Sequence, residues 1–201
     1  NNRSQKFDRN KDSFLDVPLS KQLNIMNRWQ YSNLEKGLIS FLNVRYLNDE
    51  KQSGQLDFDP KTERLSNTFW GSEIDTKRFE VSGKFGYVNP EIPYQSLGLQ
   101  LSYSNHTQDS YFGLNDYAIR HESLYSNVVY NSIISDSRHK IKTGLNATYD
   151  LYKETVNSRF FDRQERSIGG FFEYSFDNLE ALNLTAGIRI DHHNLLGTFV
   201  T

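Results

Sequence analysis

The stretch RFEVSGKFGY, residues 78–87, decides the fold predicted for this chain. Apolar or small residues alternate with polar, charged or small ones along its whole length: Phe79, Val81, Gly83, Phe85 and Tyr87 against Arg78, Glu80, Ser82, Lys84 and Gly86. Successive side chains of a β-strand point to opposite faces of a sheet. The period of two therefore predicts a strand with one apolar face and one charged face.

The same alternation recurs along the chain and predicts about eight strands in an all-β, antiparallel fold. The other predicted strands lie at 23–31, 38–46, 97–104, 124–133, 140–149, 167–176 and 182–191, and the pattern is weakest at 124–133. Each run has about the nine to eleven residues that a tilted strand needs to cross a bilayer. We therefore expect a transmembrane β-barrel.

The connections between these runs alternate between short and long. The short ones are predicted at 32–36, 89–94, 135–138 and 177–180, and the long ones at 48–73, 105–121 and 153–163. Outer-membrane barrels have tight periplasmic turns and extended extracellular loops. A soluble β-protein, the main alternative, also alternates apolar and polar residues but has no reason to lengthen every second connection.

The composition agrees with a barrel whose two faces differ. Aromatic residues make up 14% of the chain, although the mean hydropathy is −0.69. In a membrane barrel only alternate residues face lipid, and aromatic rings gather at the two interfaces. The net charge of −2 gives no basis for a nucleic-acid partner, and the chain has no cysteine for a disulfide or thiolate metal site.

Four stretches carry a resemblance to a known family. They are FDRNKDSFLDVP (7–18), NRWQY (27–31), GIRIDHHN (187–194) and GTFVT (197–201). Together with the hairpin architecture, they resemble TonB-dependent outer-membrane receptors. The resemblance implies a roughly 22-stranded barrel closed by a plug domain, in the cell outer membrane of a Gram-negative-type bacterium. It also implies import of a scarce nutrient, such as a ferric siderophore, cobalamin or another metal chelate, driven by an inner-membrane TonB complex.

On this interpretation, residues 1–201 are part of the receptor's barrel domain, and the plug domain and the other strands lie outside this stretch. An open sheet of eight strands would expose two unpaired edges to lipid, which is prohibitive. The polar face then carries charges that pair with the plug or line water: Arg28, Arg45, Arg78, Glu80, Lys84, Arg189 and Asp191.

A candidate calcium site precedes the first predicted strand. Its oxygen donors occupy positions 1, 3, 5 and 9 of a calcium-loop pattern: Asp8, Asn10, Asp12 and Asp16. The pattern departs from a calcium loop at Ser13, where glycine is expected, and at Leu19, where a bidentate glutamate is expected. The alternative is a solvated acidic turn.

Candidate ligand contacts come from the predicted loops and the outer rim: Trp70, Tyr111, Phe112, Tyr117 and His192. Aromatic rings in loops can stack on a ligand, or they can form a packed lid or an interface belt. His192 lies between Asp191 and His193 near the predicted outer rim. Neighbouring strand residues point to opposite faces, so the two histidines do not form one ligand pair.

We expect a receptor that does no chemistry on its substrate, and hence no enzyme. Two alternatives stay open. An outer-membrane hydrolase or protease would use Asp191 and His192 as a rim dyad, and would need a further nucleophile or water-holding acid. A passive porin or small structural barrel would need neither plug nor energy.

Overall fold

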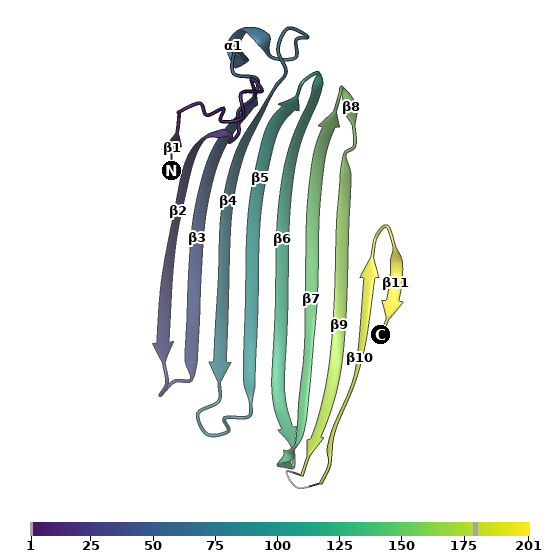
Figure 1. Cartoon of the computed structure of the whole chain (residues 1–201). Coiled ribbons are helices and arrows are strands. Elements are labelled where there is room, and N and C mark those ends of the chain that lie inside the picture. Colours follow the sequence, from purple (N-terminus) through teal and green to yellow (C-terminus); the bar gives the residue numbers. More distant parts are fainter. Residues whose placement is uncertain (1, 179–180) are drawn as a thin grey trace.

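The computed structural model describes residues 2–178 and 181–201. The strands of this part of the chain form one antiparallel sheet (Figure 1). Its long strands are β2 (Leu19–Asn33), β3 (Leu38–Gly54), β4 (Gly71–Val88), β5 (Ser96–Phe112), β6 (Asn115–Ile134), β7 (Asp136–Val156), β9 (Arg163–Asp177) and β10 (Asn183–His193). The short strands are β1 (Asn2–Arg3) beside β2, β8 (Arg159–Phe160) beside β7, and β11 (Gly197–Val200) beside β10. The prediction of an all-β antiparallel fold is confirmed, and each long strand overlaps one predicted run.

Apart from β8, which pairs only with β7, the strands follow chain order from β1 to β11, and the sheet is not closed. Within the described ranges the only helix is α1 (Pro60–Glu63), a single turn that begins where the Asp59 side chain accepts a hydrogen bond from the Lys61 N–H. No helix in the described part of the chain is long and apolar enough to span a membrane.

The connections at the lower end of the sheet in Figure 1 are short, as predicted. Those predicted at 32–36, 89–94 and 135–138 occupy 34–37, 89–95 and residue 135, while 177–180 lies partly outside the described residues. Gly37 adopts a φ of +65° in the first of these turns, and a Cβ atom there would lie 1.8 Å from the carbonyl oxygen of Val88. Only glycine therefore fits this turn.

Of the long connections predicted at the upper end, the one at 48–73 is confirmed as long, whereas those at 105–121 and 153–163 are wrong. β5 and β6 leave only residues 113–114 between them, β7 and β8 are joined at 157–158, and the connection predicted at 48–73 shrinks to 55–70. Above Phe79 both faces of the sheet carry polar residues, so the period-two signal disappears although backbone pairing continues. As a consequence Tyr111, Phe112 and Tyr117 lie in strands rather than in loops.

The pairing register gathers most of the apolar residues of the long strands on one face of the sheet, here called the apolar face. Two rows of aromatic rings cross it. The upper aromatic row is Tyr46, Phe79, Tyr103 and Tyr149, and the lower aromatic row is Tyr87, Tyr130 and Phe172. Between the rows lie exposed aliphatic side chains such as Leu101, Val128 and Leu145. Large apolar side chains are thus exposed in a continuous band rather than buried in a core.

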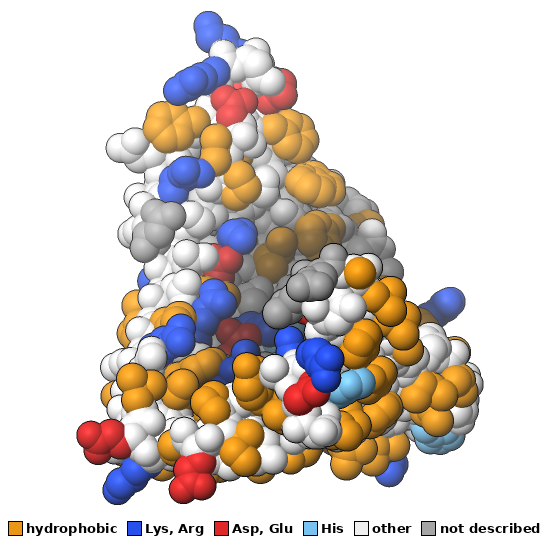
Figure 2. All heavy atoms as spheres, turned by 90° about the horizontal axis from the view of Figure 1, so that it is seen from below, with side chains coloured by type: hydrophobic (Ala, Val, Ile, Leu, Met, Phe, Trp, Pro, Cys, Tyr) orange, Lys and Arg blue, Asp and Glu red, His pale blue; other side chains and the backbone are white. Residues whose placement is uncertain are grey.

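The opposite face, here called the polar face, carries most of the charged side chains of the middle of the sheet. Seen from below, Lys, Arg, Asp and Glu side chains gather in the central hollow, with hydrophobic side chains along much of the surrounding rim (Figure 2). Arg78, Glu80 and Lys84 belong to this face, as the alternation at 78–87 predicts. The irregular pattern of β6 has a local cause, because Val129 lies on the polar face between Gly98 and Gly144.

Residues 4–16 and 55–70 pack over the upper ends of β3, β4 and β5 and are here called the upper cap. The Leu15 N–H donates to the Gly54 carbonyl at 2.9 Å, and the Leu56 N–H donates to the Ser13 carbonyl at 2.9 Å. Phe58, at 3% exposure, fills the space beside Gly71, where a Cβ atom would lie 2.3 Å from its ring. The upper cap is therefore a small packed core above the sheet.

Candidate functional site

A belt of ion pairs crosses the polar face just below the level of the upper cap. Its members come from five strands: Arg45, Arg78, Glu80, His121, Asp150, Arg163 and Glu165. Glu80 accepts from Arg45 at 3.3 Å and from Arg78 at 2.7 Å, so one carboxylate joins two guanidinium groups on neighbouring strands. These side chains are one-quarter to two-fifths exposed, and their pairing fixes them in place.

The centre of the belt is a stack of three side chains. The His121 ring lies parallel to the Tyr152 ring, with centroids 4.2 Å apart and an interplanar angle of 4°. The Arg163 guanidinium lies 3.9 Å from the centroid of the same Tyr152 ring. His121 Nε2 lies 2.8 Å from Asp150 Oδ1, which orients the imidazole. The stack presents a flat, charged surface to the hollow of the sheet.

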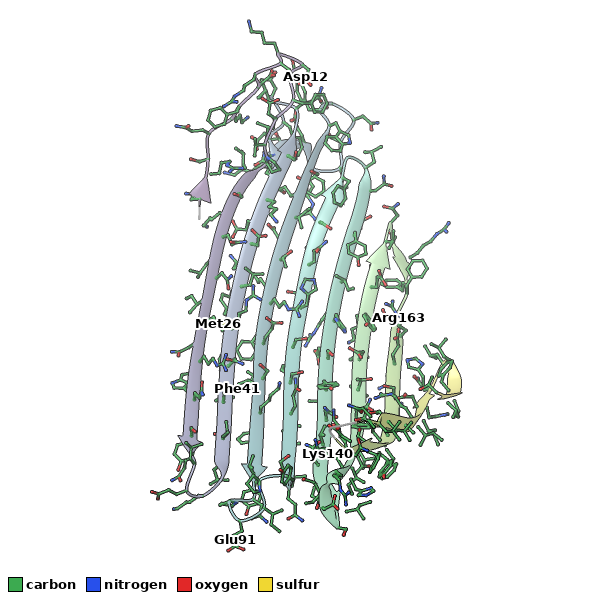
Figure 3. The ribbon with its side chains drawn as sticks, turned by 60° about the horizontal axis from the view of Figure 1, so that its bottom comes forward. Asp12, Met26, Phe41, Glu91, Lys140 and Arg163 are labelled. Carbon is green, nitrogen blue, oxygen red and sulfur yellow. The ribbon has the colours of Figure 1, made fainter. Side chains whose placement is uncertain are left out.

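Arg163 ties the belt to the upper part of the sheet. Its guanidinium donates to Glu154 at 2.7 Å and to Glu165 at 2.9 Å, and it is labelled in Figure 3. Glu154 also accepts from the Tyr117 hydroxyl at 3.0 Å. The hydrogen bond from Arg163 holds the pKa of the Glu154 carboxyl below its ordinary value, and the Tyr117 hydrogen bond acts in the same direction. Glu154 is therefore ionised at neutral pH.

A second network lies lower on the polar face. Arg189 donates to Asp191 at 2.5 and 2.7 Å, and to Asn146 Oδ1 at 3.0 Å. Gly169 lies directly beside it, and a Cβ atom there would come within 1.9 Å of Asp191 Oδ1. The glycine is needed because the network occupies the space above its backbone.

Two buried polar atoms in the described residues have no hydrogen-bond partner: Asn43 Oδ1 and His106 Nδ1. Both residues lie on the polar face, His106 in line with Arg78 and His121. A buried polar atom without a partner costs free energy.

The structure places Tyr111 inside the upper cap instead of on a loop surface. Its side chain is 1% exposed, its hydroxyl donates to Glu73 Oε2 at 2.9 Å, and the Phe58 ring meets it edge-on at 6.3 Å. Burial, and then the hydrogen bond to Glu73, raise the pKa of the Tyr111 phenol. Of the three uses open to the predicted loop aromatics, ligand stacking, a packed lid or an interface belt, this geometry matches the packed lid.

The other predicted ligand contacts are dispersed. Trp70 is 46% exposed and packs against Phe14 at 6.2 Å on the upper cap, and Phe112 is exposed on β5 close by. Tyr117 bonds Glu154 and so belongs to the polar face. The structure does not bring the five residues into one pocket, and ligand binding by any of them stays a prediction.

His192 and Asp191 lie on opposite faces of β10. Asp191 points to the polar face and bonds Arg189, whereas His192 lies on the apolar face in line with Leu42 and Leu101, its Nδ1 3.0 Å from Thr198 Oγ1. The hairpin of β10 and β11 also ends well below the top of the other strands (Figure 1). The two residues therefore do not form a rim dyad.

The acidic loop at residues 8–16 is brought together as predicted, but its oxygens bind the loop's own backbone. Asp8 accepts from the N–H groups of Asp12 at 3.2 Å and Ser13 at 3.0 Å, and Asp16 accepts from the Arg9 N–H at 2.7 Å. Asn10 donates to Asp12 at 2.8 Å. In the part of the chain that the structure describes, no three His, Asp or Glu side chains form a metal-binding group. Calcium binding by this loop stays a prediction.

Sequence reasoning missed the stack of His121, Tyr152 and Arg163. His121 and Arg163 lie in predicted connections and Tyr152 lies beyond the end of a predicted strand, and only the register brings the three side by side across β6, β7 and β9. Comparisons with protein-family models, curated proteins and solved structures found no match.

Proposed function

We propose that this chain forms part of the wall of a transmembrane β-barrel in the outer membrane of a Gram-negative-type bacterium. The observation that carries the proposal is the apolar face between its two aromatic rows. Phe79 and Tyr87 span about 27 Å along β4 at about 3.4 Å per residue. A strand tilt of about 40° reduces this height to about 21 Å, close to the roughly 25 Å apolar band of such barrels.

The open sheet supports a large barrel rather than a small one. An eight-stranded barrel would close on itself, whereas here β2 and β10 lie far apart along one continuous sheet. From Leu23 to Asn33, β2 has a strand partner on only one side within the described residues. Unpaired backbone groups in lipid are costly, so we infer that further strands of the same protein complete the ring.

Within this class we propose an active-transport receptor that imports a scarce nutrient such as a ferric siderophore, cobalamin or another metal chelate. The belt on the polar face supports it, because ion-paired side chains such as Arg45, Glu80 and His121 suit contact with a plug domain inside the barrel. In this mechanism the wall stays fixed while a TonB complex rearranges the plug. The chain's own residues position the plug and do no chemistry on the substrate.

A passive porin is the second candidate, because it also has a polar lumen. Uptake of labelled ferric siderophores and cobalamin, compared between cells that have the protein and cells that lack it, separates the two. We expect uptake that requires the protein and stops when an uncoupler collapses the inner-membrane proton gradient. Protein-dependent uptake that continues with the uncoupler would contradict the receptor and support the porin.

A further inference from the structure

Two histidines lie side by side on the polar face. His106 of β5 pairs directly with His121 of β6, in the row of residues above Glu80. Directly opposite side chains in an antiparallel pair have Cβ atoms about 4.5–5.5 Å apart. Two imidazole rings on such positions can therefore reach one metal ion between them, at the bond length of about 2.0–2.1 Å that joins a metal to a histidine nitrogen.

Asp150 and Tyr152 hold the His121 ring in one orientation. Nε2 of His121 lies 2.8 Å from Asp150 Oδ1, and the ring stacks on Tyr152 with centroids 4.2 Å apart. An ionised carboxylate only accepts hydrogen bonds, so Nε2 carries the proton and Nδ1 keeps its lone pair. Metal-binding histidines almost always make this bond from the second ring nitrogen to a carboxylate or carbonyl. His121 is thus arranged as a metal ligand through Nδ1.

The His106 ring has no hydrogen-bond partner among the residues that the structure describes. Its Nδ1 is buried, whereas Nε2 does not belong to the buried unpartnered atoms and so reaches the hollow. Half-buried polar groups without a partner are exceptions in folded proteins, and each has a cause. Coordination of a metal ion by Nε2 gives this ring a partner on the open side of the sheet.

The charges around the two histidines leave room for a cation. Arg78 lies directly opposite His106 on β4, but its guanidinium is held by Glu80 at 2.7 Å. The belt and its neighbour Glu154 hold more carboxylates than guanidinium groups: Glu80, Asp150, Glu154 and Glu165 against Arg45, Arg78 and Arg163. A divalent ion at the two rings is therefore not repelled by a positive surrounding.

We propose that His106 and His121 bind a divalent transition-metal ion of the zinc and copper class in the hollow of the sheet. Asp150 is the positioning residue for His121, and water completes the coordination. Imidazole nitrogen suits these ions, whereas Ca²⁺ and Mg²⁺ prefer oxygen ligands. The ion would cross-link β5 to β6. The inference goes beyond the proposed function and does not rest on it, because strand pairing alone forms the site.

The test uses the full protein in detergent micelles, without a histidine tag, and titrates it with Zn²⁺ in a calorimeter. Ca²⁺ serves as the oxygen-preferring control ion. The variants are H106Q and H121Q. Their matched control is H139Q/H192Q, which removes two histidines that lie on the apolar face. The measured quantity is the difference in Zn²⁺ binding between each variant and the wild type.

We expect H106Q and H121Q each to weaken Zn²⁺ binding at this site by about 100-fold or more. Loss of an outer partner alone costs about 10–100-fold, so D150A should weaken binding by about tenfold. The control H139Q/H192Q should bind Zn²⁺ as the wild type does, and Ca²⁺ should not compete. With Cu²⁺ as a second probe, the electron spin resonance spectrum should show two bound ring nitrogens in the wild type and one in either single variant.

The variant H106C separates loss of a ligand from loss of the fold. A cysteine thiolate is itself a zinc ligand, so H106C should keep the Zn²⁺ binding that H106Q loses. Equal Zn²⁺ binding by the wild type and H121Q would overturn the inference, and so would a wild type that binds no Zn²⁺. Loss of binding in H139Q/H192Q alone would also overturn it, because the ion would then lie elsewhere. Each of these negative results leaves the membrane barrel standing.

Discussion

Phe79 and Tyr87 lie on the same face of β4, and each belongs to one of the two aromatic rows that bound the exposed aliphatic band. Phe79 is 41% exposed and Tyr87 is 44% exposed, although both are large apolar side chains. In water such a band would be a severe aggregation hazard. Between two membrane interfaces the same band is the stable arrangement.

Adjacent residues on β5 should respond oppositely to a new charge. Leu101 lies between the aromatic rows and Ser102 lies on the polar face. In lipid vesicles, Leu101→Arg should lower the free energy of unfolding by about 2–4 kcal/mol, the cost of a cation in the middle of the lipid face. Ser102→Arg should change it much less. Reversible urea unfolding of the refolded protein measures both, and similar losses would contradict the assignment of the faces.

The hydrogen bond between Tyr111 and Glu73 should stabilise the upper cap. Tyr111→Phe leaves the half-buried Glu73 side chain without its donor and should cost about 1.5–3 kcal/mol, the range for hydrogen bonds to charged groups. The matched control is Tyr87→Phe, which changes an exposed ring and should cost less than about 0.5 kcal/mol. Thermal unfolding measures the difference, and equal midpoints for the two variants would argue against a packed cap.

Gly169 should not tolerate a methyl group. In Gly169→Ala the new Cβ would overlap Asp191 Oδ1, so Asp191 must leave Arg189 or the strands must separate. We expect a loss of about 1–3 kcal/mol, typical of overpacking. Gly98→Ala is the control, because its nearest heavy atom to a Cβ would be 4.0 Å away. Equal stability of the two variants in urea unfolding would show that the network at Arg189 is not formed.

The carboxyl of Asp136, the first residue of β7 at the lower end of the sheet, should titrate far below its usual range. Hydrogen bonds from the Arg138 side chain and backbone lower its pKa from 3.8 to about 2. Because the folded-state pKa is depressed, the stabilisation from this pair is complete above about pH 4 and is lost as the pH falls toward 2. Carboxyl ¹³C shifts should give this pKa directly, and Arg138→Gln should return it toward 3.8. An unchanged pKa in Arg138→Gln would contradict the assigned cause.

The strands and their faces could be predicted from the sequence wherever apolar and polar residues alternate, as they do from Phe79 to Tyr87. The upper ends could not. At Lys77 and Asp75 the apolar side of β4 becomes charged, so both faces are polar and nothing in the local pattern distinguishes a strand from a loop. The pattern therefore predicts a loop at Tyr111, although this residue is buried under Phe58 in a strand.

The sequence predicts the polar face as a set of inward charges but not as a network. The pairing of Arg45 and Arg78 with Glu80, and the stack of His121 on Tyr152, depend on the register between strands. Register is set by turn lengths and by the whole pattern of both strands, so short motifs do not reveal it. The hypothesis that Asp191 and His192 form a dyad can be excluded without the register, since alternation alone places these neighbouring residues on opposite faces.

The most direct test of the membrane barrel compares two neighbouring residues of β6. The chain has no cysteine, so single variants Val128→Cys and Asn127→Cys can each carry one spin label without background labelling. In lipid vesicles, the label at Val128 should relax with oxygen dissolved in the bilayer and stay protected from a water-soluble nickel chelate, whereas the label at Asn127 should not be in contact with lipid. If the nickel chelate reached Val128 as readily as it reaches an exposed loop, the apolar face would not meet lipid and the account would be contradicted.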